Sequence, residues 1–113
     1  MNSSQSGTTR RWHRYPVELR LRVDVVQNGK TTSVFGRSSS LSEGGMGAYI
    51  PCEIPVGTTI VVAFTLSGFP NEISITATVR NVEGFRYGLE FLRVSEDVRV
   101  RIVKSCSASA LPN

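Results

Sequence analysis

The sequence predicts an all-β domain, a six-stranded antiparallel β-barrel with a short C-terminal helix. Several short stretches alternate apolar and polar residues with the period of two that half-buried strands show, and glycine and proline residues separate them with no long helical pattern between. A chain of 113 residues with 40% hydrophobic and 19% charged residues is typical of one globular domain. Short strands spaced in this way favour a closed or nearly closed antiparallel barrel.

The first two strands are predicted to form a hairpin. In residues 17–25, valine and leucine alternate with charged side chains, which places one face in a core and the other in water. Asn28 and Gly29 then provide the pair that best tolerates the positive φ angles of a tight turn. Residues 31–36 are expected to return as the second strand.

A serine- and glycine-rich loop is expected at residues 38–47, followed by the remaining strands. In two of them, alternate apolar residues are expected to face the core, namely Ile60, Val62, Phe64, Leu66, Ile73, Ile75, Ala77 and Val79. The expected strands cover residues 47–50, 59–66, 72–82 and 85–92.

Residues 95–105 fit two patterns. A serine followed by two acidic residues at 95–97 is typical of a helix N-cap and first turn, and Val94, Val98 and Ile102 recur at helical spacing. Residues 98–102 also alternate like a strand. Because the cap and the basic residues near the end of the segment agree with each other, we favour the helix.

The chain is expected to hold a flexible tail over residues 1–9, one domain over residues 10–105 and a second flexible tail over residues 106–113. It shows no apolar secretory segment and no apolar run near the roughly 18 residues that span a bilayer, so a cytoplasmic location without membrane insertion is expected. In that compartment Cys52 and Cys106 are expected to be free thiols.

The net charge of +4 is concentrated in the first third of the chain. Residues 1–37 contain seven Arg and Lys against two acidic residues, a balance of +5, whereas residues 38–113 contain six against seven, a balance of −1. A local cluster on a neutral body fits a small anion at least as well as it fits nucleic acid.

Residues suited to catalysis or metal binding are sparse. His13 is the only histidine, and it lies among arginines with no second base or nucleophile in the pattern. One histidine and two distant cysteines lack the close spacing of a zinc site, and no Lys-Ser or Lys-Thr follows the glycine-rich residues 42–47 as a Walker loop requires. The sequence therefore predicts no enzyme, no cofactor and no metal site.

Two segments have the chemistry of anion binding. Arg10, Arg11 and Arg14 bring three guanidinium groups into five residues before the first strand, and folding alone does not require this cluster because like charges repel. In residues 38–47, glycines permit close backbone approach and serine hydroxyls offer donors and acceptors.

Together these segments resemble the PilZ domain family, whose members carry an RxxxR motif on an N-terminal arm and a [D/N]xSxxG motif on a barrel loop. Residues 10–14, RRWHR, match the first motif, and residues 40–45, SLSEGG, match the second except at its first position. GGMGA at 44–48, YGLEFL at 87–92 and the order of elements are also similar. The resemblance spans residues 10–104 and implies a six-stranded barrel that acts as a receptor for the bacterial second messenger cyclic di-GMP.

The resemblance also implies the residues of the ligand site. The guanidinium groups of Arg10 and Arg14 suit phosphate oxygens and the O6 and N7 edge of guanine, and they can stack on the bases. Arg11 would add a phosphate contact or general attraction. Ser42 would hydrogen-bond a base or a phosphate, and Gly45 would leave room for the ligand to approach the backbone.

Ser40 stands where the family has Asp or Asn. A serine hydroxyl is shorter, and it cannot supply the anionic acceptor that Asp offers to the N1 and N2 donors of guanine. Losing a charge-assisted hydrogen bond costs about 1.5 to 3 kcal/mol, a ten-fold to more than hundred-fold loss of affinity. The departure therefore predicts weakened binding, or a member that has lost the nucleotide and kept a protein partner.

A receptor implies a downstream protein partner. Two alternatives to the receptor interpretation stay open. The first is a PilZ-like adaptor that binds proteins and no small ligand. The second is a small-barrel binder of single-stranded nucleic acid that uses Arg20, Arg22 and Arg37 as a track for the backbone. Only 8% of the residues are aromatic and most lie in strand patterns, which argues against nucleic acid.

Overall fold

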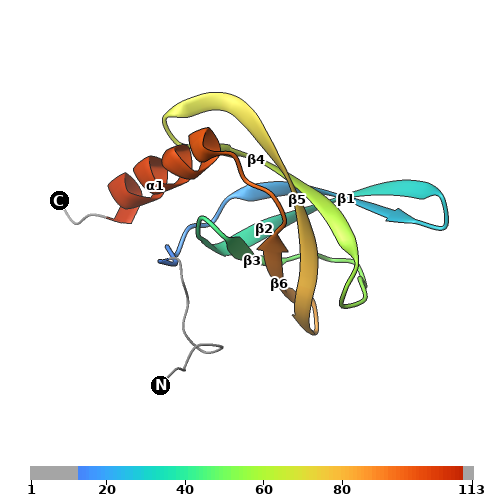
Figure 1. The fold of residues 1–113 in the computed structure, drawn as a ribbon. Helices are drawn as coiled ribbons and strands as arrows, with labels where there is room; N and C mark the ends of the chain where they lie inside the picture. Colours follow the sequence, from blue (N-terminus) through green and yellow to red (C-terminus); the bar gives the residue numbers. More distant parts are fainter. Residues whose placement is uncertain (1–12, 111–113) are drawn as a thin grey trace, which may run out of the picture.

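The structure, a computed structural model, describes residues 13–110, and these residues form six strands and one helix. Every neighbouring pair of strands is antiparallel, and the strands close a barrel in the order β1-β2-β3-β6-β5-β4, which confirms the predicted all-β fold (Figure 1). The elements are β1 (Arg20–Gln27), β2 (Lys30–Leu41), β3 (Gly45–Tyr49), β4 (Thr59–Leu66), β5 (Phe69–Glu83), β6 (Arg86–Phe91) and α1 (Glu96–Ala110).

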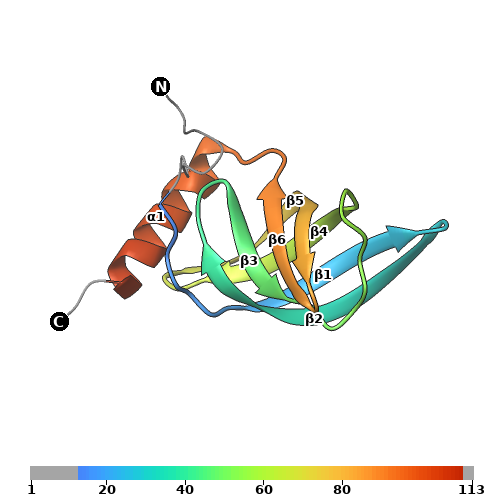
Figure 2. The same ribbon diagram turned by 90° about the horizontal axis from the view of Figure 1, so that it is seen from below.

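Alternate apolar side chains of the strands fill the barrel, as the period of two predicts. The eight residues of β4 and β5 that were expected to face inward are all buried. Helix α1 lies across one end of the barrel, where Ile102 and Cys106 join the core with 0% and 1% exposure (Figures 1 and 2). The helix therefore covers the apolar contents of that end.

The β1–β2 hairpin turns at Asn28 and Gly29, whose φ angles of 54° and 76° agree with the predicted tight turn. The first strand begins later than residue 17, however. The buried hydroxyl of Ser38 donates to the carbonyl of Val17 over 2.6 Å and accepts from the N–H of Leu19 over 2.8 Å. A side chain thus replaces part of the backbone ladder, and regular pairing starts only at Arg20.

The serine- and glycine-rich segment is mostly strand rather than the predicted loop. β2 continues to Leu41 and β3 begins at Gly45, which leaves residues 42–44 as the connection. The backbones pair across it, with Ser40 opposite Gly47 and a register shift between Ser38 and Ser40. Ser40 therefore lies on a strand, where its neighbours are fixed.

The C-terminal helix is confirmed, but it extends past the predicted domain end at residue 105. Ser95 caps it, with its Oγ accepting from the N–H of Val98 over 3.2 Å. The helix continues to Ala110 because Cys106 is buried in the core and the Ser107 hydroxyl donates to Tyr15 Oη over 3.2 Å. The predicted tail over residues 1–9 lies outside the described residues.

The helix in the described residues is neither long nor apolar enough to cross a membrane. Cys52 and Cys106 are free thiols, as predicted.

Candidate functional site

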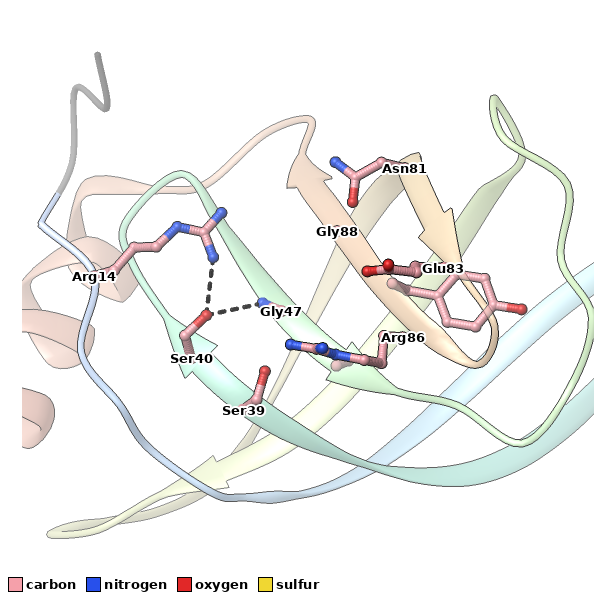
Figure 3. Close-up of a pocket in the computed structure, with 10 residues that line it drawn as sticks. Arg14, Ser39, Ser40, Gly47, Asn81, Glu83, Arg86 and Gly88 are labelled. Atoms are coloured by element: carbon pink, nitrogen blue, oxygen red, sulfur yellow. Dashed lines mark hydrogen bonds between the residues drawn. The ribbon is translucent and has the colours of Figure 1, made fainter. Parts of the chain in front are cut away.

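A pocket of about 290 Å³ lies across four neighbouring strands (Figure 3). Strands β3 and β6 form its floor, and β2 and β5 form its two sides, in agreement with the order of strands in the barrel. The residues that line it are Arg14, Ser39, Ser40, Gly47, Ala48, Asn81, Glu83, Arg86, Tyr87 and Gly88.

The floor contains two glycines side by side. Gly47 on β3 pairs with Gly88 on β6. A Cβ at Gly88 would come within 2.5 Å of the Asn81 amide, and one at Gly47 would come within 2.9 Å of Ser39 Oγ and 3.0 Å of Ser40 Oγ. Because neither floor residue has a side chain, the Asn81 amide and the hydroxyls of Ser39 and Ser40 can lie close over the floor.

Arg14 and Ser40 form one side of the pocket. Tyr15 and Leu41 exchange two backbone hydrogen bonds of 2.9 Å, which fixes the chain just after Arg14 against the end of β2. From there Nη1 of Arg14 donates to Ser40 Oγ over 2.9 Å, and the N–H of Gly47 donates to the same oxygen over 3.2 Å. The pocket therefore has a guanidinium group held at its rim.

The opposite side is formed by the β5–β6 hairpin. Glu83 and Arg86 pair across the turn, and the guanidinium group of Arg86 lies 5.6 Å from the centre of the Tyr49 ring. Figure 3 shows Arg86 extending into the pocket from the side opposite Arg14. Two cations and one carboxylate thus give the described lining a formal charge of +1.

A β-bulge lies on each side of the pocket. One shifts the register of β2 between Ser38 and Ser40, and the other shifts that of β5 between Val79 and Asn81. Bulges re-aim side chains and are frequent beside functional sites. Here the second one turns Asn81 outward, whereas uninterrupted alternation from Val79 would place it in the core.

The structure brings together two of the six predicted site residues, Arg14 and Ser40. Arg10 and Arg11 lie outside the described residues. Ser42 and Gly45 are described, but neither lines the pocket.

Ser42 and Gly45 make contacts within the barrel. The hydroxyl of Ser42, 5% exposed, accepts from the N–H groups of Gly44 and Gly45 over 3.2 and 3.1 Å and donates to the Gly45 carbonyl over 3.2 Å. A Cβ at Gly45 would come within 2.3 Å of the Leu89 carbonyl oxygen. These residues therefore shape the turn that leads from β2 to β3.

Sequence reasoning missed the residues of the β5–β6 side, Asn81, Glu83, Arg86 and Gly88. Their strands were predicted, but nothing local reveals that these strands lie beside β3. The alternation in Tyr87-Gly88-Leu89 is a signal that could have placed Gly88 on the outer face.

The three arginines of the nucleic-acid alternative lie on β1 and β2, outside this pocket. Arg22 pairs with Glu72 over 3.3 Å and Arg37 with Glu18 over 3.4 Å. These carboxylates offset the charge of two of the three arginines, which weakens the attraction of the track for a phosphate backbone. Within residues 13–110, no cluster of three or more His, Cys, Asp or Glu could hold a metal ion.

Comparison with known proteins identifies the family of this chain. A family model described as PilZ domain matches residues 8–108. The chain belongs to the PilZ domain family. No match was found among curated proteins. Neither the family match nor the structural neighbours indicate a class of enzyme.

Several solved structures share the fold. The PilZ domain of CeSA from a cellulose-synthesizing bacterium has a TM-score of 0.64 and 18% identity, covering 88% of this chain and 99% of that one. The PilZ domain of YcgR from Escherichia coli, solved with c-di-GMP, has a TM-score of 0.68 and 21% identity, covering 89% and 93%. MotI/DgrA, an inhibitor of motility from Bacillus subtilis, has a TM-score of 0.71 and 15% identity, and the match covers 90% of this chain but 51% of that protein.

Proposed function

We propose that this PilZ domain is a receptor for cyclic di-GMP that binds the nucleotide in the pocket across β2, β3, β6 and β5 and passes the signal to a partner protein. It acts by binding and not by catalysis. The observation that carries the proposal is the position of Arg14, the second arginine of the RxxxR motif, against Ser40, the first residue of the second motif. One residue of each motif, the two being far apart in sequence, thus lines the same pocket.

The chemistry of the lining supports a ligand with phosphates and purine bases. Arg14 and Arg86 offer guanidinium groups from two sides, and such groups bind phosphate oxygens with two parallel hydrogen bonds or stack on a base. Over the glycine floor, the Asn81 amide and the hydroxyls of Ser39 and Ser40 offer hydrogen-bond donors and acceptors. A formal charge of +1 favours an anion over a neutral metabolite.

The size of the pocket supports a contribution from the N-terminal arm. A volume of about 290 Å³ lies just below the roughly 300–1,000 Å³ typical of ligand sites. The pocket thus suits one base with its phosphate, and we assign the rest of the dinucleotide to Arg10 and Arg11. Ser42 and Gly45 act in the proposal by holding the turn beside Ser40.

Isothermal titration with cyclic di-GMP tests the proposal, with its linear dinucleotide and a short single-stranded oligonucleotide as comparators. A receptor binds the cyclic dinucleotide most tightly. Equal binding of all three, or tightest binding of the oligonucleotide, contradicts the proposal in favour of the nucleic-acid alternative. Binding of none leaves the protein-interaction adaptor.

A further inference from the structure

The hydroxyl of Ser40 has no acceptor capacity left for a ligand. Its oxygen has two lone pairs, and it already accepts from Nη1 of Arg14 over 2.9 Å and from the N–H of Gly47 over 3.2 Å. Only its O–H remains, and an O–H donates. Ser40 therefore cannot accept hydrogen bonds from the N1–H and N2–H₂ groups by which guanine differs from adenine.

Glu83 supplies a carboxylate on the opposite side of the same pocket. It is the one acidic residue among those described as lining the pocket, and within residues 13–110 its carboxylate has no ion pair within 4.0 Å. Figure 3 shows its carboxylate on the β5 side of the floor. An ionised carboxylate has two oxygens that only accept, which complements two adjacent N–H donors on one edge of a base.

Asn81 is placed to complete the recognition of that edge. The bulge in β5 turns it out over Gly88, where a Cβ would meet its amide atoms at 2.5 to 2.8 Å. Its NH₂ group can donate to a carbonyl oxygen such as O6 of guanine. A base in the pocket beside this amide would thus face one donor and one carboxylate.

We infer that Glu83, assisted by Asn81, is the residue that selects guanine in this pocket and takes over the acceptor role that Ser40 cannot perform. The inference rests on the proposed function. Adenine presents an N6–H₂ donor and an N1 lone pair on the same edge, so its N1 would face the carboxylate unpaired. Arg86, opposite Glu83, and Arg14 offset the repulsion between this carboxylate and the ligand phosphates.

The test is isothermal titration of the parent, Glu83→Gln and Glu53→Gln with cyclic di-GMP and with cyclic di-AMP. Glu53 is an exposed carboxylate outside the pocket, so its variant has the same charge change. Glu83→Gln is expected to lower the preference for cyclic di-GMP over cyclic di-AMP by about ten-fold or more, and Glu53→Gln to leave it unchanged. Circular dichroism melts check that all three proteins fold.

The outcomes separate this inference from the proposed function. If the parent binds cyclic di-GMP and Glu83→Gln keeps the full preference, the assignment of Glu83 is overturned while the receptor stands. If both glutamate variants lose the preference equally, net charge and not the pocket sets it, and the assignment is again overturned. If the parent binds neither dinucleotide, the proposed function is wrong and the assignment fails with it.

Discussion

Nη1 of Arg14 donates a hydrogen bond of 2.9 Å to Oγ of Ser40, and this bond joins the segment before the first strand to β2. Both residues belong to motifs singled out in the sequence, and the β-bridge between their neighbours Tyr15 and Leu41 brings them together. The bond fixes a guanidinium group at the edge of the glycine floor.

Replacement of Arg14 by alanine is expected to weaken cyclic di-GMP binding about ten-fold to a hundred-fold, because one charged partner of the ligand is removed. Stability should change little, since Arg14 lies outside the core. Titration and thermal unfolding of the same samples measure both effects. Arg93→Ala, which removes an equal charge outside the pocket, is the control, and equal affinities of the two variants would contradict the prediction.

Replacement of Ser40 by aspartate is expected to strengthen cyclic di-GMP binding. The carboxylate can accept from Arg14 and still offer a free oxygen to the ligand, which the serine oxygen cannot. Ser40→Asn, which adds an acceptor without charge, should give a smaller gain. The dissociation constants of the parent, Ser40→Asp and Ser40→Asn for cyclic di-GMP test this prediction. If neither variant binds more tightly than the parent, Ser40 does not contact the ligand.

Two glycine substitutions are expected to have different effects. Alanine at Gly45 brings a methyl group within 2.3 Å of the Leu89 carbonyl oxygen, so strands β3 and β6 must move apart. The free energy of unfolding should therefore fall by about 1 to 3 kcal/mol. Alanine at Gly47 comes closest to the hydroxyls of Ser39 and Ser40, which can rotate, and meets Arg14 Nη1 at an ordinary contact distance of 3.8 Å, but its methyl group fills the pocket floor.

Urea unfolding should therefore show a lower free energy of unfolding mainly for Gly45→Ala. Titration with cyclic di-GMP should show a weaker affinity mainly for Gly47→Ala. A Gly47→Ala protein that binds with parental affinity would show that the ligand does not lie on this floor.

Burial raises the pKa of the Cys106 thiol. The folded state therefore keeps the thiol neutral after the unfolded chain begins to ionise it at about pH 8.5. The neutral thiol makes its full contribution to the free energy of unfolding below that pH. This contribution is lost as the pH rises toward the raised pKa, by at most about 1.4 kcal/mol per pH unit.

Urea unfolding from about pH 7.5 to 10 measures this loss. The free energy of unfolding should fall less steeply with pH for Cys106→Ala than for the parent. For Cys52→Ala it should fall as steeply as for the parent. Equal slopes for the parent and Cys106→Ala would contradict the prediction.

The fold could be predicted from the sequence to a large extent because period-two alternation and turn residues are local. Residues 59–66 form β4 with the predicted bounds, and Ser95 starts the helix. The site could be predicted only on the side that the motifs mark. Asn81 escaped prediction because a bulge reverses the face on which alternation places it, and a bulge depends on the register with another strand.

Ser40 was predicted to lie in a loop for a related reason. Serines and glycines have low strand propensity, and in residues 38–47 that local preference is overridden by the ladder that β2 and β3 form together. The end of the helix was misplaced because small residues follow Cys106, whereas the burial of that thiol depends on the completed barrel.

The pairing of β3 with β6 has a further consequence for the chain as it folds. Gly47 and Gly88 are joined only when β6, the last strand in the chain, pairs with β3, so the two local hairpins that line the pocket, β2–β3 and β5–β6, meet through contacts between residues distant in sequence. Such contacts form late, after the entropy of closing long loops has been overcome. A fragment of the chain that lacks β3 or β6 does not contain the pocket. A newly synthesised chain can therefore bind the ligand only after β6 has paired with β3.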